Sequence, residues 1–566
     1  MALPWHIPLE AIPSLKERKG KYKYSSILKH YCNLQLHETP CEELQTGLMC
    51  DINVVNREVA TIQRLIASGM TIARINMREV EPEARAHLIQ SIRQAVYNYS
   101  AELQYVYPLA LIVDIKGPDI VTGDLKNGPT STVEIVKLST IRLTTDYSWR
   151  ECGTSECLWV GYDHLTDLRR GDIIFIDSLL GGKIKLIVSE VGDDSIECKT
   201  VEGGIIGPKM TVRIMQVPQD NQSSHSQGDS SSVSMGSSTS QDNDELIEQQ
   251  IAWAISSDMD ALLVANTQTV NDVKIVRDAL GEKGKHILVF SCIETILGID
   301  KIDDILSVSD GIYLDRSILS LDLPVEKIFI AQKIIVSKCN YAGKPCIIKA
   351  VINEQLPSLC VTDVANLVLD GADVLALELQ YDSPLKKFAP TYDAVKMAEH
   401  CMAAAGVICR HAERITWQPR IYGNPELMKS PILEPTKGIC ISAVELAMRS
   451  ISVAIIVLTN SGRTARTISH IKPPCPVIAV TRACHSARQL RFWKGVRAVH
   501  YFEVPKGNWA LEVEARIHTA LDYCKAKRII RAGDPYVVIS GSRRGVGYCD
   551  SVRLLYASAR NTVVAD

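Results

Sequence analysis

The sequence lacks the features that place a chain in a membrane or direct it to secretion. It contains no run of about 18 apolar residues, so no transmembrane helix is expected. Residues 1–26 hold neither a continuous apolar segment nor a small-residue cleavage site, which argues against a secretory signal and favours a flexible, basic arm over residues 1–42. The expected compartment is therefore the cytoplasm.

A dominant charge and paired cysteines are also missing. The net charge is only −3, so no overall field draws the chain to nucleic acid or to an anionic membrane. The 17 cysteines are odd in number and include no C-x-x-C pair. Neither a zinc site nor a disulfide framework follows from them.

What the chain does have is length and apolar content. Its 566 residues predict roughly three or four domains, and a content of 46% hydrophobic and 22% charged residues is typical of a globular protein with a large core. One segment departs from this composition, because residues 218–244 are rich in serine and almost free of apolar residues. We expect a disordered linker there.

Short β-branched runs alternate with amphipathic helical stretches over much of the chain. Buried parallel strands show such runs, and strand–helix repetition on this scale predicts a (β/α)₈ barrel. The runs are TIARINM (71–77), LALIVDIKG (109–117), ALLVAN (261–266), ILVFSCIE (287–294), GIYLD (311–315), PCIIKAV (345–351) and VLALEL (374–379).

Two stretches break that alternation. Residues 118–217 hold short alternating runs separated by Gly and Asp turns, which predict a small β domain inserted into a barrel loop. Residues 402–566 predict an open, mostly parallel α/β sheet. Its strands are AIIVLTN (454–460), PVIAVTR (476–482), VRAVHYF (496–502) and YVVISGS (536–542), and the barrel itself is divided between 43–117 and 245–401.

Several long motifs follow one another in the order of a known family. ASGMTIARINM resembles a segment that ends in an R-x-N strand, LIVDIKGPDIVTG resembles D-T-K-G-P-E-I-R-T-G, and AIIVLTNSGRTA and the segment from SDGIYLDRSILS onward are similar to further blocks. On these motifs the chain, over roughly residues 43–566, is identified as a member of the pyruvate kinase family. The resemblance implies a TIM barrel with an inserted small β-barrel domain and a C-terminal open α/β domain.

The resemblance also implies an activity. The family transfers a phosphoryl group between phosphoenolpyruvate and ADP in the last step of glycolysis, which gives pyruvate and ATP. It uses Mg²⁺, K⁺, a lysine, an arginine and a threonine, and it is usually tetrameric, so either a homotetramer or a mixed tetramer is expected. Retained positions are Arg74 and Lys116 among the catalytic residues, and Asn76, Asp114 and Glu294 among the metal-binding ones.

Two charged positions of the family pattern are replaced. The lysine that stabilises charge on the transferring group is Cys292, and a thiol has the wrong charge for that task. The second carboxylate for Mg²⁺ falls at Ile318. Mg²⁺ tolerates incomplete coordination poorly, so weak or absent metal binding is expected. Asp315 is a candidate replacement, but its side chain need not point into the site.

Other family positions are also changed. Potassium contacts fall at Arg78 and Ile115, the neighbouring histidine at Glu79, the nucleotide-side arginine at Val121 and the threonine at Ala350. Two glycines that let backbone amides approach the substrate are Ser317 and Ser320, and S-G-E-T is replaced by residues 377–380. An apolar side chain cannot substitute for bidentate phosphate contact. The resemblance therefore implies a family member with impaired catalysis.

A structural explanation stands beside each of these roles. Glu294 can cap a neighbouring helix, and Asp114 can pair with Lys116. Cys292 can be a redox or nucleophilic centre, but no partner base is identifiable, and a buried inert thiol is the favoured interpretation.

The C-terminal domain carries a second candidate site. TNSGRT (459–464) follows a strand and precedes a helix, which is the arrangement of a phosphate cradle. In regulated family members this loop holds a phosphate of fructose 1,6-bisphosphate, although Asn460 replaces a lysine here. Candidate contacts are Thr459, Ser461, Gly462, Arg463, Thr464, Trp509, Arg516 and Gly545.

Three hypotheses remain open from the sequence. The first is an impaired pyruvate kinase paralogue that acts as a regulatory or partner subunit. The second is an active pyruvate kinase with a compensated site. The third is a module that binds sugar phosphates or phosphopeptides through its C-terminal domain.

Overall fold

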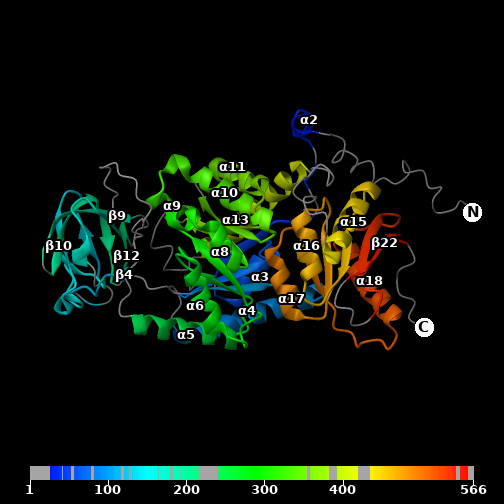
Figure 1. The fold of residues 1–566 in the computed structure, drawn as a ribbon, viewed down its shortest axis with the longest axis horizontal. Helices are drawn as coiled ribbons and strands as arrows, with labels where there is room; N and C mark the ends of the chain where they lie inside the picture. Colours follow the sequence, from blue (N-terminus) through cyan, green and yellow to red (C-terminus); the bar gives the residue numbers. More distant parts are fainter. Residues whose placement is uncertain are drawn as a thin grey trace, which may run out of the picture.

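The chain folds into three bodies that lie side by side along the long axis of the molecule (Figure 1). A computed structural model describes residues 26–37, 39–40, 43–52, 57–77, 82–115, 120–126, 128, 131–162, 165–178, 183–192, 194–208, 210–215, 240–353, 357–380, 392–417, 434–543 and 549–558. Arg78, Glu79, Lys116 and Gly545 lie outside the described residues, as does most of the serine-rich segment. No described helix is long and apolar enough to cross a membrane.

The central body is a closed barrel of eight parallel strands in the order β1-β17-β16-β15-β14-β13-β3-β2, which confirms the predicted fold. The sequence analysis did not identify β1, which closes the ring by pairing with β17 and β2. The strands are β1 (Gly47–Asp51), β2 (Ile72–Asn76), β3 (Ala110–Ile115), β13 (Ala261–Val264), β14 (Leu288–Ile293), β15 (Gly311–Leu314), β16 (Cys346–Asn353) and β17 (Val374–Gln380).

Helices surround the barrel because each has an apolar face to bury. In α3 (Val59–Ala67), the buried residues Thr61, Ile62, Leu65 and Ile66 recur at helical spacing. The last residues of the serine-rich segment already belong to α5, which begins at Ser240. The other helices are α4 (Pro82–Leu103), α5 (Ser240–Ser256), α6 (Val270–Leu280), α7 (Ile296–Asp300), α8 (Ile302–Val308), α9 (Arg316–Asp322), α10 (Ile328–Ala342), α11 (Pro357–Asp370) and α13 (Tyr392–Ile415).

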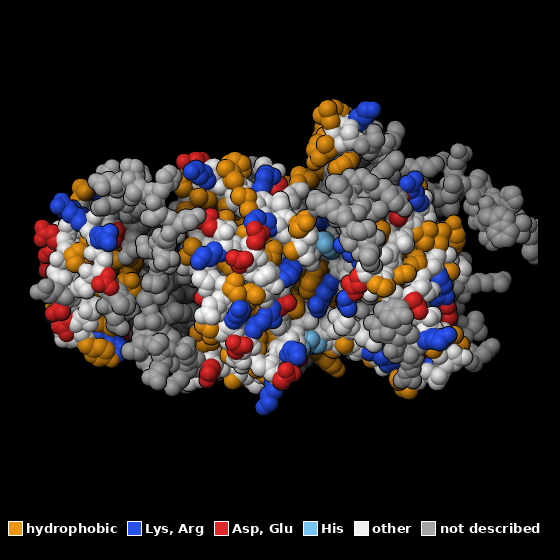
Figure 2. Space-filling view, in the orientation of Figure 1, with side chains coloured by type: hydrophobic (Ala, Val, Ile, Leu, Met, Phe, Trp, Pro, Cys, Tyr) orange, Lys and Arg blue, Asp and Glu red, His pale blue; other side chains and the backbone are white. Residues whose placement is uncertain are grey.

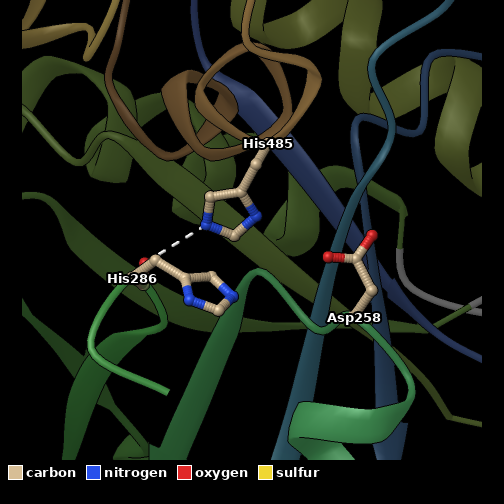
Figure 3. Close-up of side chains that lie close together, drawn as sticks. All are labelled: Asp258, His286 and His485. Atoms are coloured by element: carbon tan, nitrogen blue, oxygen red, sulfur yellow. Dashed lines mark hydrogen bonds between the residues drawn. The ribbon is translucent and has the colours of Figure 1, made fainter. Parts of the chain in front are cut away.

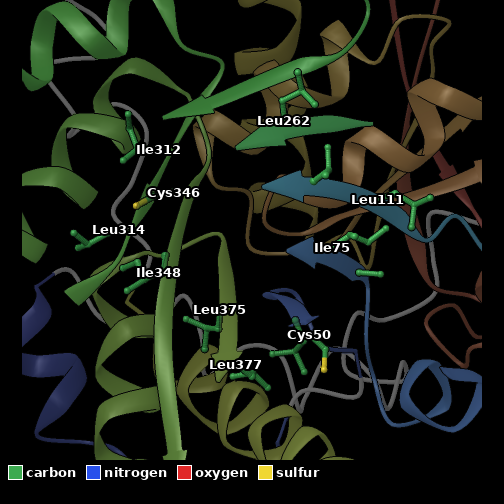
Figure 4. Close-up of a cluster of buried hydrophobic side chains, with 14 of the residues drawn as sticks. Cys50, Ile75, Leu111, Leu262, Ile312, Leu314, Cys346, Ile348, Leu375 and Leu377 are labelled. Carbon is green, nitrogen blue, oxygen red and sulfur yellow. The ribbon is translucent and has the colours of Figure 1, made fainter. Parts of the chain in front are cut away.

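Side chains along each barrel strand alternate between two apolar clusters. One cluster joins the outer side of the strands to the helices and includes Cys50, Ile75, Ile348 and Leu375 (Figure 4). The second fills the barrel and includes Met49, Ile72, Phe290 and Ile347. Because side chains of a strand alternate in direction, this pattern also determines which residues at the strand ends point inward.

The inserted body is a seven-stranded sheet in the order β4-β12-β8-β9-β10-β6-β7. An isolated antiparallel bridge between Thr122 and Val160 links its two edges, so the sheet curls into the small barrel that was predicted. A two-stranded sheet of β5 and β11 lies beside it. The bounds are β4 (Ile120–Val121), β5 (Val133–Ile135), β6 (Thr140–Thr144), β7 (Cys157–Trp159), β8 (Ile173–Asp177), β9 (Lys183–Val191), β10 (Ser195–Glu202), β11 (Gly204–Ile206) and β12 (Thr211–Met215).

The C-terminal body is a five-stranded sheet in the order β20-β19-β18-β21-β22, in which only β22 runs antiparallel to its neighbour. The sequence analysis anticipated the four parallel strands but not β22. Its elements are α15 (Pro435–Ser450), β18 (Ile455–Leu458), α16 (Arg463–Ile471), β19 (Val477–Thr481), α17 (Cys484–Gln489), β20 (Val496–His500), α18 (Trp509–Ala526), β21 (Pro535–Ser540) and β22 (Ser551–Tyr556).

The C-terminal body packs against the amino end of the barrel. The ring of Phe492 lies 4.9 Å from that of Phe290, centroid to centroid, and both belong to the cluster that fills the barrel. Arg488 of α17 pairs with the buried Asp260, which precedes β13. This end is therefore closed, and the opposite mouth faces the inserted body (Figure 1).

Candidate active site at the barrel mouth

Charged side chains gather at the carboxyl ends of the barrel strands. Parallel strands place these ends at one face, which is where barrel enzymes hold their active sites. Side chains along a strand alternate between the inside and the outside of the barrel, and Met49, Ile72 and Ile347 point inward. By the same alternation, a ring of charged and polar residues nearer the strand ends also faces inward. These are Asp51, Arg74, Asn76, Asp114, Cys292, Glu294, Tyr313, Asp315, Lys349 and Glu378.

Arg74 is held by two carboxylates. Its guanidinium donates to Asp114 at 2.6 Å and to Asp51 at 3.2 Å, and it lies 5.2 Å from the centre of the Tyr313 ring. Burial alone would lower the pKa of Arg74, but Asp51, Tyr313 and Asp114 outweigh it and raise that pKa well above its ordinary value. The arginine expected to hold a phosphoryl group is thus already engaged with anions of the protein.

Asp114 keeps one oxygen unused. Its Oδ2 accepts from Arg74, whereas Oδ1 is buried and has no hydrogen-bond partner among the described residues. Ile115, at the potassium position, packs outward into the cluster between strands and helices. Val121 lies in β4, where it pairs with Thr211 of the inserted sheet.

Cys292 is a buried, neutral thiol. It is 3% exposed and donates from Sγ to Oε1 of Glu294 at 3.3 Å. Burial, followed by the carboxylates of Glu294, Asp315 and Asp114, raises the pKa of this thiol well above its ordinary value. The side chain therefore supplies neither a cation nor a thiolate at neutral pH.

The inserted domain brings two cations to the mouth. Nη1 of Arg213, on β12, lies 3.4 Å from Oε2 of Glu294. Burial and the neighbouring Arg213 lower the pKa of Lys183, on β9, to about 8, against the opposing effect of Asp177, Asp315 and Glu294. The sequence analysis missed both residues, because no pattern in the inserted domain indicates which strand faces the barrel.

Asp315 joins a third set of ion pairs. Its Oδ2 accepts from Nζ of Lys349 at 3.0 Å, and the same Nζ lies 2.9 Å from Oε2 of Glu378. Burial would raise the pKa of Asp315, but Lys349 and the N–H of Ile318 outweigh it and lower that pKa. The sequence analysis did not select Lys349. The alternation along the strand could have identified it as an inward-facing residue, because it follows the inward-facing Ile347 by two positions.

The segment after β15 is a helix start. The N–H groups of Ser317 and Ile318 donate to Oδ1 of Asp315, which caps α9. The amide of Ser317, one of the two positions expected to approach a substrate, is therefore bound to the protein itself. Ala350, at the threonine position, is fully buried in the cluster between strands and helices and does not line the barrel interior.

The loop predicted to be a phosphate cradle is a turn from a strand into a helix. Thr459 to Gly462 connect β18 to α16, and the positive φ of Gly462 (78°) makes the turn into the helix. The N–H of Gly462 donates to Oγ1 of Thr459 at 3.0 Å. Ser461 is exposed at this turn, whereas Thr464 is buried against Cys549.

The cations of this second site are paired. Nε of Arg516 lies 2.8 Å from Oε1 of the buried Glu512, which Arg482 also contacts at 2.7 Å. Arg463 pairs with Glu434. Trp509 stacks near Arg516, with its ring centre 5.7 Å from the guanidinium, and donates from Nε1 to the carbonyl of Gly541.

Similarity to known proteins agrees with this geometry. The family model for the pyruvate kinase barrel domain matches residues 44–380, and that for the pyruvate kinase alpha/beta domain matches residues 437–555. The chain is 33% identical to pyruvate kinase PKLR of Rattus norvegicus over 94% of its own length and 88% of the relative's. Identity to pyruvate kinase 1 of Trypanosoma brucei brucei is 30%, over 94% of this chain and 99% of the relative. With this barrel, this inserted domain and these two matches, the chain belongs to the pyruvate kinase family.

Proposed function

We propose that this protein is a pyruvate kinase-family member with impaired phosphoryl transfer, which serves as a regulatory or partner subunit. One observation carries the proposal: two inward-facing basic side chains of the barrel strands, Arg74 and Lys349, are paired with carboxylates of the mouth. Arg74 pairs with Asp51 and Asp114, and Lys349 pairs with Asp315 and Glu378. Phosphoryl transfer depends on cationic groups that neutralise phosphate, and a phosphate that binds Arg74 or Lys349 has to displace an internal carboxylate here.

The residues present do not fit the family's Mg²⁺ site. Glu294 is engaged by Arg213 and Cys292, and the position of the second carboxylate is Ile318. Asp315 does not replace it, because Lys349 and two backbone amides already use its oxygens. Mg²⁺ requires near-ideal oxygen coordination, so we propose that Mg²⁺ binds weakly or not at all. For K⁺, Asn76 is retained in the sequence and Oδ1 of Asp114 has no hydrogen-bond partner among the described residues, but Ile115 provides no ligand.

Loss of the lysine charge acts in the same direction. A preorganised cation beside the transferring group stabilises charge that develops in the transition state, and removing one such donor typically costs about 10²–10³ in rate. Cys292 is neutral and buried at that position. Arg74 and Lys116 remain as catalytic candidates by family resemblance, and Arg74 has two carboxylates as competitors.

Lys349 favours a second candidate function, an active pyruvate kinase with a compensated site. Its ammonium group lies on the inner side of the barrel, 3.0 Å from Asp315 and 2.9 Å from Glu378. If the ammonium group of Lys349 moved away from these carboxylates, it would be an unpaired cation at the mouth where Cys292 lies. This function requires Lys349 to act where the family uses another lysine.

A coupled assay with phosphoenolpyruvate, ADP, Mg²⁺ and K⁺ separates the two functions. We expect the purified protein to turn over at least roughly a hundredfold more slowly than an active relative assayed beside it. The double variant C292K/I318D should raise the rate at least tenfold, while the matched uncharged variant C292M/I318N should not. Parent turnover within tenfold of the relative would contradict the proposal, and its loss in Lys349→Met would establish the second function.

The subunit role has its own measurement. The family implies phosphoenolpyruvate and ADP as ligands and a tetrameric assembly, either of identical or of mixed chains. Co-expression with an active relative, followed by affinity capture and light scattering, should give a mixed oligomer with altered substrate response. If the two chains purify separately and the kinetics of the active relative stay unchanged, the protein is not a subunit of that enzyme.

A further inference from the structure

A histidine and carboxylate cluster lies at the other end of the barrel, remote from the mouth. Asp258 and His286 precede β13 and β14, and His485 belongs to α17 of the C-terminal domain. One potential ligand atom from each of these residues lies within 4.8 Å of the other two. Figure 3 shows the two imidazoles edge to face, with the Asp258 carboxylate beside them, and the ring centres are 4.6 Å apart. Two parts of the chain about 200 residues apart thus contribute to one cluster.

The orientation of His485 is set by hydrogen bonds. Its Nε2 lies 3.2 Å from the carbonyl oxygen of His286, drawn as the dashed line in Figure 3. A carbonyl only accepts, so Nε2 carries a proton and Nδ1 is the nitrogen that can offer a lone pair. Metal-binding histidines are typically fixed in this way, through a hydrogen bond from the other ring nitrogen to a backbone carbonyl. Nδ1 lies 3.3 Å from Oδ1 of the buried Asp260, so a metal ion bound to Nδ1 has to displace any proton shared with that carboxylate.

One cationic side chain already lies at the cluster, because Nη2 of Arg488 is 3.5 Å from Nδ1 of His485, so a metal ion has to displace it. Arg488 is shared between the two carboxylates, at 2.7 Å from Oδ2 of Asp258 and 2.8 Å from Oδ1 of Asp260. Arg93 is farther away, 3.9 Å from Asp258, and more than half exposed. Among the described residues, nothing donates to Oδ1 of Asp258 or hydrogen-bonds to a ring nitrogen of His286. One carboxylate oxygen and one imidazole are therefore available as ligands.

We propose that Asp258, His286 and His485 bind a transition-metal ion of the Zn²⁺ class and so fasten α17 to the barrel. Two imidazoles and one carboxylate are a donor set that suits Zn²⁺ and disfavours Mg²⁺. In a tetrahedral site with bonds of about 2.0–2.1 Å the ligand atoms lie roughly 3.3 Å apart, so the three have to close by about 1.5 Å at most. Asp258 and His286 are exposed at the surface, and Asp258 has to loosen its ion pair with Arg488 to make that movement.

Calorimetry with ZnCl₂ on the full chain, in chelator-free buffer, tests the site. We expect one ion bound per chain through the cluster, with affinity reduced at least roughly tenfold in His286→Gln and in His485→Gln. His400→Gln, which removes an exposed histidine of α13 outside the cluster, should bind like the parent. MgCl₂ should give no heat from this cluster. An affinity unchanged in both cluster variants, or no Zn²⁺ binding by the parent, would overturn the proposal.

Two further measurements keep the result unambiguous. Cys484 is an exposed thiol next to His485 and could bind Zn²⁺ in its place. We expect Cys484→Ser to keep the affinity for Zn²⁺, and a loss of affinity in this variant would contradict the proposed set of ligands. Thermal unfolding should shift upward with Zn²⁺ in the parent and not in His286→Gln, because an ion that binds only the folded state stabilises it. His286 is exposed, so this variant should fold normally, which circular dichroism verifies.

Discussion

The guanidinium of Arg74 lies 2.6 Å from the carboxylate of Asp114, on the neighbouring strand of the barrel. Both side chains are largely buried, with 12% and 9% of their surface exposed, and Asp51 completes the set at 3.2 Å. Arg74 and Asp114 neutralise each other at this position unless a substrate or a metal ion competes for one of them. Its role in stability can be measured separately from its role in binding.

Arg74→Met should destabilise the barrel by about 3 kcal/mol, because it leaves Asp114 buried without its cation. The measurement is the chemical denaturation midpoint of the barrel, followed by circular dichroism. Adding Asp114→Asn should recover part of the loss, since the uncompensated charge is removed. Arg170→Met, at an exposed site of the inserted domain, is the control. A loss of unfolding free energy below about 1 kcal/mol would mean that water solvates the charge of Asp114 in place of Arg74.

Arg213→Ala should increase the affinity for Mn²⁺, used as a spectroscopic substitute for Mg²⁺. The substitution frees Oε2 of Glu294 from a cation 3.4 Å away and removes like-charge repulsion of the metal. Electron paramagnetic resonance titration measures free Mn²⁺, with Arg170→Ala as the charge-matched control. Equal affinities in the parent, the variant and the control would show that Arg213 does not restrict this carboxylate.

Cys292 should resist alkylation in the native protein at pH 8. Its thiol is 3% exposed, and burial raises its pKa well above the ordinary value, so both access and thiolate are lacking. Iodoacetamide labelling with peptide mass spectrometry should modify the exposed Cys32, Cys152 and Cys484 first. Labelling of Cys292 at a comparable rate would support a reactive thiol in place of an inert one.

Ionised Glu512 should stabilise the folded protein, and this stabilisation should be lost as the pH becomes acidic. Burial would raise its pKa, but hydrogen bonds from the backbone N–H of Lys506 and from the side chains of Arg482 and Arg516 lower it to about 2. A carboxylate whose folded pKa is lowered contributes stability above its unfolded pKa of about 4.3, and this contribution is lost as the pH falls toward 2. Glu512→Gln should therefore lose less stability than the parent between pH 5 and pH 2, as followed by urea denaturation. Parallel pH profiles would contradict this.

Glu512 also pairs with Arg516, a candidate contact of the predicted sugar-phosphate site. Arg516 is bound to Glu512 at 2.8 Å, so fructose 1,6-bisphosphate has to compete with a carboxylate. Calorimetry should show weak binding by the parent, stronger binding by Glu512→Gln and none by Arg516→Ala. Absence of binding in both the parent and Glu512→Gln would remove this site from consideration.

Much of the fold was predictable because periodicity is a local property. The β-branched runs at 287–294 and 374–379 anticipated β14 and β17, and four apolar runs at 454–542 anticipated the parallel strands of the C-terminal sheet. Strands β1 and β22 were missed. Each lies where pairing with distant segments, not a strong local pattern, defines the strand.

The sequence by itself determined the family, the three bodies of the fold and the chemical identity of the replaced positions, including Cys292 and Ile318. Only the tertiary structure decided how the remaining charges pair. Lys349 meets Asp315, Arg213 meets Glu294, and His485 meets Asp260 across two domains. The physical reason is that a Coulomb interaction depends on distance in space, while the sequence orders only distance along the chain.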